Sequence, residues 1–367
     1  MAEYKTFVNK ISVSPDKKTK QKEYLNKGRL AIVDQGQNLI GGYTDNLNMM
    51  VECDLPVIVF GDHTRAVKYI TFPFGAGADG IKILKPKENV LPLFLFYATQ
   101  YIVAKMPDRG YARHYQYVEK EDLTVPSIPE QQRIVSHIEE LFSSLDNAVE
   151  TLQKTKEQLT VYRQTVLKEA FEKVSARVSL ESVSESRLGK MLDKEKNVGN
   201  PRRYLRNINV RWFSFDLNNL LEMRIEDNEV DRYTLCKGDL VICEGGEPGR
   251  CAVWDSDDII FYQKALHRVR FTDNSNPKFY MYFLYYAAQR GQLKPLFTGT
   301  GIKHLTGQSL KKVLVPTTER IVQDRIVNEI ESRLSVCDSI EQTVNTALSQ
   351  AEAMRQSILK EAFEGKL

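Results

Sequence analysis

Near its end the chain repeats a segment of its middle, and this repeat constrains the fold more than any other feature of the sequence. Residues 162–172 (YRQTVLKEAFE) and 354–364 (MRQSILKEAFE) are identical at eight of eleven positions. Upstream of them, residues 133–135 (RIV) recur as residues 325–327. Two copies of one segment indicate two copies of one architecture. We therefore predict a tandem duplication in which each of two variable blocks is followed by a shared tail.

The shared tails have the pattern of long helices. No Gly or Pro occurs between Glu130 and Lys173, and apolar residues recur every seven positions in both tails. The row consists of Ile138, Leu145, Leu152, Leu159 and Val166 in the first tail and of Ile330, Cys337, Val344, Ala351 and Ile358 in the second. We place a second row three residues after each of these positions. Heptads sustained in this way predict a coiled coil.

The length of each helix implies a partner. Some 44 residues form a rod of roughly 65 Å, which is longer than a small domain is wide. The nearest partner is the other copy. Since the first helix leads from block one to block two, the second helix returns along it, and we predict an antiparallel coiled coil with pseudo-twofold symmetry. The alternative is two separate amphipathic helices, each packed on its own globular domain.

The two variable blocks have the composition of small α+β domains. Each mixes short β-like runs with glycine-rich turns and contains one aromatic-rich helix, at residues 93–105 and 277–292. The predicted boundaries are 1–128 for the first globular domain, 129–174 for the first helix, 175–318 for the second domain and 319–367 for the second helix.

A search for catalytic motifs in the sequence finds none. It contains no phosphate-binding P-loop, no complete glycine-rich dinucleotide motif and no Asn/Asp-Pro-Pro-aromatic tetrapeptide of amino-group methyltransferases. Cys236, Cys243 and Cys251 are spaced by seven and eight residues, and Cys243 lies in an apolar run, which favours buried thiols over a metal site. We expect neither catalytic residues nor a metal in this chain.

Polar side chains beside glycines are the residues best suited to bind a ligand. Arg and Lys read guanine edges or hold phosphates, and Asn and Gln read adenine, so such loops suit recognition of DNA. The candidates are Gln35, Thr44, His63, Thr64, Arg65, Arg109, Tyr111, Arg113 and His114 in block one, and Arg203, Arg206, Asn207, Glu247, Arg250, Lys303 and His304 in block two. The alternative is that these loops are simply solvated or stabilise their own turns. The pairs Arg113-His114 and Lys303-His304 stand at equivalent points of the two halves.

These features together resemble the specificity subunit of Type I restriction-modification systems. The first block contains VDQGQNLIGGYTDN (33–46), PVIVFGDHTRAVKYITFPFGAGADGIKIL (56–84) and GYARHY (110–115). The second contains YLRNINVRWFSFDL (204–217) and GDLVICEGGEPGRCAVW (238–254). The helix openings VPSIPEQQRIV (125–135) and VPTTERIVQDRIV (315–327) are similar to that family too.

The resemblance implies a non-catalytic subunit with two target recognition domains, each of which reads one half of a bipartite, asymmetric DNA sequence. The helices would set the gap between the halves and bind two modification subunits. The heptad residues named above would form either the contact between the two helices or the surface that binds those subunits. S-adenosylmethionine would be bound by those partners, ATP and Mg²⁺ by restriction subunits, and no cofactor by this chain. The partners expected are double-stranded DNA, two modification subunits and, in systems that restrict, two restriction subunits.

One departure concerns the first block. The second block runs 144 residues from Lys173 to Pro316, whereas the first has 126 up to Pro126, a shortfall of 18. Residues 179–190 have only a vague counterpart in residues 7–13. Either the first domain is trimmed at its start or its true start lies upstream.

Two rival functions stay open from the residues alone. One is a stand-alone DNA-modifying enzyme with unrecognised catalytic residues, and the other is a coiled-coil scaffold with two protein-binding heads. The net charge of +3 in 367 residues supports no partner by itself. The five Cys are odd in number, no apolar run spans a membrane, and residues 1–10 lack the core of a signal peptide. We expect a cytoplasmic protein.

Overall fold

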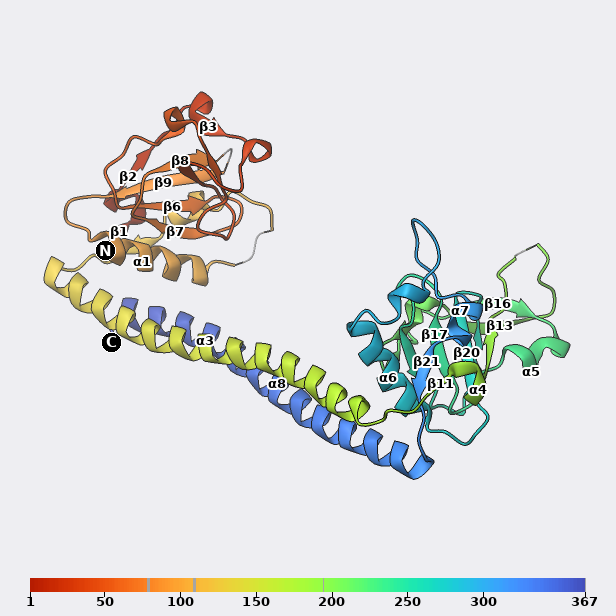
Figure 1. The fold of residues 1–367 in the computed structure, drawn as a ribbon. Coiled ribbons are helices and arrows are strands. Elements are labelled where there is room, and N and C mark those ends of the chain that lie inside the picture. Colours follow the sequence, from red (N-terminus) through yellow and green to blue (C-terminus); the bar gives the residue numbers. More distant parts are fainter. Residues whose placement is uncertain (78–79, 108–109, 194, 367) are drawn as a thin grey trace. The chain divides into compact units, whose positions relative to one another are not determined.

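The computed structural model describes residues 1–77, 80–107, 110–193 and 195–366, which form two compact units (Figure 1). Unit 1 consists of Met1–Gln153 with Val344–Leu367, and unit 2 consists of Lys154–Thr343. Each unit therefore contains one variable block, which we call its head, together with a stretch of both shared tails.

The head of unit 1 contains two four-stranded sheets. One is antiparallel throughout, in the order β2 (Val8–Ile11), β9 (Ile81–Pro86), β6 (Val57–Gly61) and β7 (Val67–Ile70). In the other, β8 is parallel to both its neighbours, in the order β3 (Lys18–Thr19), β8 (Phe74–Gly77), β4 (Leu30–Val33) and β5 (Gly42–Thr44). This head also contains the paired strands β1 (Ala2–Glu3) and β10 (Asp122–Leu123) and the α-helices α1 (Pro92–Lys105) and α2 (Tyr115–Val118).

The central strand β6 is covered on both faces, which explains its uninterrupted apolar sequence. Val57 and Val59 pack between the two sheets. Ile58 and Phe60 belong to a second cluster that contains α1 residues such as Phe94. Because alternate side chains of a strand point to opposite faces, a strand buried on both sides needs apolar residues at every position.

The head of unit 2 repeats this plan. Its antiparallel sheet has the order β12 (Ser184–Leu188), β20 (Leu266–Phe271), β17 (Leu240–Cys243) and β18 (Cys251–Val253). Its second sheet has the order β16 (Leu221–Ile225), β13 (Asn200–Leu205) and β19 (Phe261–Tyr262), with β13 parallel to β19. The remaining elements are β11 (Arg177–Ser179) paired with β21 (Leu314–Pro316), the hairpin β14 (Val210–Arg211) and β15 (Ser214–Phe215), and the helices α4 (Leu180–Val183), α5 (Val230–Tyr233), α6 (Pro277–Gln289) and α7 (Gly307–Lys311).

Strand β17 is the counterpart of β6. Leu240 and Ile242 pack with residues of α6, whereas Val241 and Cys243 pack in the cluster on the other face of the sheet. Burial raises the pKa of Cys243 to about 11, so its thiol stays protonated at neutral pH. The two heads thus share one topology although their sequences differ, and the predicted pair of α+β domains is confirmed.

The long helices are α3 (Ile128–Glu172) and α8 (Arg320–Phe363), and they pair antiparallel (Figure 1). In unit 2, Arg163 of α3 forms an ion pair with Asp338 at 2.7 Å, and Glu169 forms one with Arg333 at 2.8 Å. Residue numbers rise along α3 as they fall along α8, which is the signature of antiparallel chains. In unit 1, Arg355 of α8 forms an ion pair with Asp146 of α3. The predicted coiled coil is confirmed.

The seam between these helices differs from the expected one in its second row. Every member of the first row is buried or half-buried. Three residues later, however, Tyr162, Ile340 and Met354 are 41%, 40% and 55% exposed. Four residues after the first row, by contrast, Phe142 and Ala362 are buried and Leu348 is half-buried. A heptad alternates steps of three and four residues, and the sequence pattern alone did not reveal which step comes first.

The second head is longer than the first because it contains additional elements within its fold. The pairs β1–β10 and β11–β21 correspond to one another, as do the edge strands β2 and β12. The hairpin β14–β15 and the helix α5 of unit 2 have no counterpart among the elements described for unit 1. Among the residues the structure describes, no helix combines the length and apolar character needed to cross a membrane.

Candidate nucleic-acid interface

Three loops of unit 1 that are far apart in the sequence meet around the turn between β6 and β7. The hydroxyl of Thr64 in this turn donates a hydrogen bond to the backbone carbonyl of Gln35, which follows β4. Nδ1 of His63 lies 3.1 Å from the backbone oxygen of Ala112, in the segment that precedes α2. We call residues 34–38, 61–66 and 110–115 loop cluster 1. Of the nine candidate residues predicted for this head, seven lie in loop cluster 1, all of them among the residues that the structure describes.

Asp62 joins two of these loops from within. Its carbonyl accepts the backbone N–H of His114 at 2.8 Å, and its Oδ1 accepts the N–H of Tyr115 at 2.9 Å. The imidazole of His114 is itself buried, with Nε2 3.2 Å from the carbonyl of Gly110. His114 therefore stabilises loop cluster 1 and is not exposed to a ligand in this structure.

Tyr111 is the most exposed aromatic residue of the cluster. Its side chain is 85% exposed, and its ring stacks on that of His63 with centroids 4.4 Å apart. Because a carbonyl oxygen only accepts, the hydrogen bond to Ala112 requires the proton of His63 to be on Nδ1, which leaves Nε2 as an acceptor in the neutral ring. An exposed ring beside such an acceptor suits contact with bases or sugars at a groove.

The remaining candidates of unit 1 differ in their setting. Arg65 adopts a left-handed backbone conformation (φ 60°) at the tip of the β6–β7 turn, and Arg113 is exposed. Thr44 pairs with Leu30, so it lies at the opposite end of the β4–β5 hairpin from Gln35 and outside the cluster. Arg109 lies outside the residues that the structure describes.

In unit 2 the loop between β17 and β18 is held by its own charged side chains. Arg250 donates from Nη1 to Glu247 at 2.9 Å and from Nη2 to the backbone carbonyl of Asn207, also at 2.9 Å. The indole of Trp212 donates to the other oxygen of Glu247 at 2.7 Å. The Glu247 side chain is still 52% exposed, so it is a fixed acceptor that faces solvent.

A third loop completes the arrangement. Thr298 and His304 exchange both backbone hydrogen bonds, at 2.9 and 3.0 Å, and Nζ of Lys303 donates to the carbonyl of Gly299 at 2.7 Å. His304 lies directly against Gly245, where a β-carbon would come within 3.1 Å of its Nδ1. We call residues 206–209, 244–250 and 298–305 loop cluster 2.

The two clusters are built on one backbone plan. The N–H of Leu305 donates to the carbonyl of Glu244 at 2.7 Å, as that of His114 does to Asp62. This hydrogen bond aligns His114 with Leu305, one residue away from the pairing of His114 with His304 expected from the sequence. Arg113 and Lys303 still lie in equivalent loops, and both are exposed.

The two remaining candidates of unit 2 are near the end of β13. Arg206 donates to the carbonyl of Asn219 at 2.7 Å, and its N–H donates to Asn209 at 3.0 Å, so its position is fixed by its own loop. Arg203 is exposed on the strand, opposite Glu222 on β16.

Sequence reasoning missed two residues that support these loops. Lys68 is 4% exposed, and its ammonium donates to the backbone carbonyl of Asp34 at 2.8 Å, next to Gln35. Burial lowers the pKa of this lysine, while the nearby Asp34 carboxylate opposes the shift. Trp212, which holds Glu247, is the other. Neither Lys68 nor Trp212 stands beside a glycine in a polar loop, which is the pattern that predicts the other candidates.

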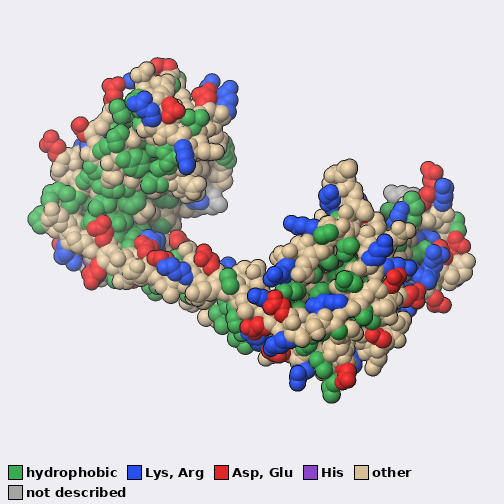
Figure 2. Space-filling model, viewed as in Figure 1, with side chains coloured by type: hydrophobic (Ala, Val, Ile, Leu, Met, Phe, Trp, Pro, Cys, Tyr) green, Lys and Arg blue, Asp and Glu red, His purple; other side chains and the backbone are tan. Residues whose placement is uncertain are grey.

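The face of the molecule shown in Figure 2 is mixed in charge. Lys and Arg side chains alternate with Asp and Glu on the face shown in Figure 2. This face is therefore not uniformly basic, and on it any affinity for a polyanion depends on individual cations. Within residues 1–77, 80–107, 110–193 and 195–366, no group of three His, Cys, Asp or Glu side chains is arranged to hold a metal ion.

Comparison with known proteins gives the family context. No protein-family model matches the chain. The specificity subunit of the Type I restriction enzyme EcoKI from Escherichia coli (strain K12) is 27% identical over 271 residues, which cover 67% of this chain and 58% of that protein. The StySPI specificity subunit of Salmonella potsdam is equally similar over the same share of each chain. This chain resembles Type I specificity subunits. The resemblance predicted from the sequence motifs is thereby confirmed, although the chain spans only 58% of the length of these relatives.

Solved structures agree on the fold of a Type I specificity subunit. The HsdS subunit from Thermoanaerobacter tengcongensis matches with a TM-score of 0.58 and 16% identity, over 100% of this chain and 96% of that one. A chain from a study of complex assembly and conformational transition in a Type I R-M system matches with a TM-score of 0.76 and 15% identity, over 100% and 97%. At these identities the match establishes a shared fold.

Proposed function

We propose that the chain is the DNA sequence-specificity subunit of a Type I restriction-modification complex, in which each head reads one half of a bipartite, asymmetric target. The observation that carries this proposal is the pair of loop clusters. Two heads of the same topology present three loops each at corresponding positions, and the side chains on those loops differ. A twofold pair of identical readers requires a palindrome, so two different readers in one chain suit a target with unlike halves.

The chemistry of the clusters fits a groove of DNA. Loop cluster 2 presents Glu247 as a fixed acceptor, which suits the amino group of cytosine. Arg203, an exposed donor on β13, lies outside this cluster. Loop cluster 1 presents Tyr111 and His63, with Arg113 exposed in the same loop. The two readers therefore offer different patterns of donors and acceptors, which is what unlike half-sites need.

Catalysis belongs to the partners in this proposal. The chain itself would bind no cofactor, and modification subunits docked on the α3–α8 coiled coil would bring S-adenosylmethionine. Restriction subunits, where present, would bring the ATP- and Mg²⁺-dependent activities. The long helices would set the unspecified gap between the half-sites.

The experiment that tests the proposal is co-expression of this chain with the modification subunit encoded beside it, followed by genome-wide mapping of methylated adenine. The expected result is methylation at one split, asymmetric motif that disappears when this chain is omitted. A complex that forms but methylates nothing would contradict the specificity role. Methylation or cleavage by this chain alone would favour the stand-alone enzyme instead.

A further inference from the structure

Each long helix begins with a buried glutamine that is bonded to the head of its own unit. Gln131 and Gln323 are 0% and 2% exposed, and they occupy the same position in the two copies of the repeat, 192 residues apart. Glutamine is seldom buried so completely, because each hydrogen-bonding group of its amide then needs a partner inside the protein.

In unit 1 the amide of Gln131 is satisfied by three backbone groups. Its Oε1 accepts the N–H of Leu91 at 2.8 Å, and its Nε2 donates to the carbonyls of Pro126 at 2.9 Å and Asn89 at 3.0 Å. Leu91 immediately precedes α1, and Pro126 lies in the segment that leads into α3. One side chain thus joins the start of the aromatic-rich helix to the start of the long helix.

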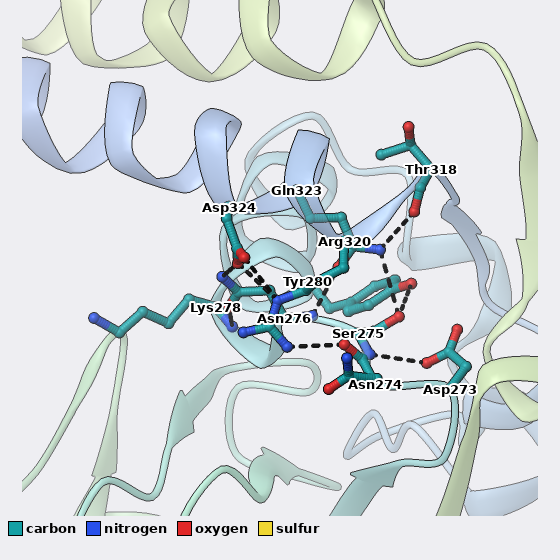
Figure 3. Close-up of polar contacts among 10 residues, drawn as sticks. All are labelled: Asp273, Asn274, Ser275, Asn276, Lys278, Tyr280, Thr318, Arg320, Gln323 and Asp324. Atoms are coloured by element: carbon teal, nitrogen blue, oxygen red, sulfur yellow. Dashed lines mark hydrogen bonds and ion pairs between the residues drawn. The ribbon is translucent and has the colours of Figure 1, made fainter.

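Unit 2 has the same joint (Figure 3). Oε1 of Gln323 accepts the N–H of Asn276 at 2.7 Å, and its Nε2 donates to the carbonyl of Thr318 at 2.9 Å. Asn276 immediately precedes α6, as Leu91 precedes α1. The Asn276 side chain adds a hydrogen bond of 2.7 Å to Asp324 of α8, which reinforces this second copy.

The partners of the two glutamines are mainly backbone groups, and this has a consequence for how heads are joined to helices. Every non-proline residue has an N–H, so the joint does not depend on which side chain stands at Leu91 or Asn276. Two heads with different sequences are therefore attached to their helices by two equivalent hydrogen bonds of the glutamine, while the third goes to the carbonyl of Asn89 in unit 1 and to the hydroxyl of Ser275 in unit 2.

We propose that Gln131 and Gln323 are positioning residues that fix the direction in which each long helix leaves its head. The inference rests on the proposed function, because the direction of a head matters most when two heads must meet two half-sites separated by a set gap. Loss of either glutamine loosens the joint and leaves the loop clusters themselves intact.

The test uses the full chain in its complex with the modification subunit and the target identified by methylation mapping. Gln131→Ala and Gln323→Ala are compared with Gln132→Ala, whose side chain is exposed on the same helix. The readout is the ratio of the affinity for the native gap to the affinity for a gap changed by one base pair. We expect this ratio to fall roughly fivefold to tenfold in the first two variants and to stay unchanged in the third, with the base preference within each half-site retained.

Gln131→Met and Gln323→Met keep the volume of the side chain and serve where the alanine variants do not fold. Amide hydrogen exchange adds a local measurement, since the N–H groups of Leu91 and Asn276 should exchange faster in each folded variant than in the unaltered chain. Folded variants with an unchanged gap ratio would overturn the positioning role even if their stability fell. If the unaltered chain recognises no bipartite target, the proposed function fails, and unchanged exchange at Leu91 and Asn276 would then refute the joint separately.

Discussion

Arg270 and Asp239 form a two-pronged ion pair in the second head, with Nε bonded to Oδ1 and Nη2 to Oδ2, both at 2.7 Å. The Asp239 side chain is 2% exposed, and its Oδ2 also accepts the N–H of Cys236 at 2.7 Å. The hydrogen bond to Asp239 raises the pKa of Arg270 above its ordinary value. Since Asp239 directly precedes β17, the pair fixes the strand that ends at loop cluster 2.

Replacement of Arg270 by Met should therefore destabilise the second head. It removes the paired charge and leaves a buried carboxylate with too few donors, which costs about 2–4 kcal/mol of the free energy of unfolding. Urea unfolding measures this quantity. The matched control is Arg187→Met on the neighbouring strand β12, where the ion pair with Glu185 is exposed and a loss below ~1 kcal/mol is expected. Equal losses in the two variants would refute the structural role of the buried pair.

His267 makes the stability of the second head depend on pH. Burial lowers the pKa of this histidine, although the hydrogen bond from its Nε2 to the carbonyl of Leu305 (3.0 Å) and the nearby Glu244 oppose the shift. The unfolded chain takes up the proton near a pH of about 6.5 and the folded chain only at lower pH. The contribution of His267 is therefore fully present above about pH 6.5 and is lost as the pH falls through that value towards the folded pKa.

Urea unfolding between pH 7.5 and pH 5 measures this effect, with those limits chosen to bracket ~6.5. The free energy of unfolding should fall more steeply in the unaltered chain than in His267→Gln. The control variant His137→Gln changes a partly exposed histidine on α3 and should leave the slope as it is. Identical slopes in all three proteins would contradict the assignment.

The sequence predicted those parts of the fold that depend on local periodicity. The duplication, both long helices and strands such as β6 and β17 follow from repeats of seven and from short apolar runs, and the structure has them where expected. The second row of the seam was misplaced, because polar and apolar residues alternate there too irregularly to distinguish a step of three from a step of four. Residues such as Tyr162 illustrate this, being aromatic yet 41% exposed.

The candidate interface was harder to predict, because its contacts join residues far apart in the chain. Glycine-flanked polar residues identified the loops, but not that Trp212 would reach Glu247, 35 residues away. Nor did the sequence indicate that His114 is buried or that the backbone aligns it with Leu305. Such contacts depend on which loops the sheet brings together, and the local sequence does not indicate which loops those are.

Trp212→Phe should change specificity at the second half-site alone. The phenyl ring keeps most of the packing against Tyr285 but lacks the N–H that fixes Glu247. With its acceptor less well oriented, the second head should lose about 1–2 kcal/mol of discrimination between the correct base and a substituted one. Binding to target variants altered in one half-site at a time measures this loss. Discrimination at the first half-site is the internal control, and a loss there of the same size would contradict the assignment of Glu247.

Arg113 and Lys303 should each contribute to phosphate binding. Both are exposed at equivalent loops, so replacing either by Ala should weaken binding similarly for all sequences and reduce the slope of log affinity against log salt by about one. Lys237→Ala is the matched control. Lys237 precedes β17 at the end opposite loop cluster 2 and lies near Asp255 and Asp257. A slope unaltered in the Arg113 and Lys303 variants would mean that these residues only stabilise their loops.

A matched lengthening of both long helices tests whether they set the gap between the half-sites. Seven residues inserted after Leu152 in α3 and seven after Leu348 in α8 preserve the heptad seam and add about 10 Å to the rod, at 1.5 Å per residue. Since base pairs are stacked about 3.4 Å apart, the preferred gap should grow by about three base pairs, with both half-sites unchanged. Methylation mapping with the lengthened chain measures the new gap.

Insertion in α3 alone is the control, because it breaks the pairing of the two helices and should abolish recognition. A lengthened chain that folds and still methylates the original motif would exclude the helices as the determinant of the gap.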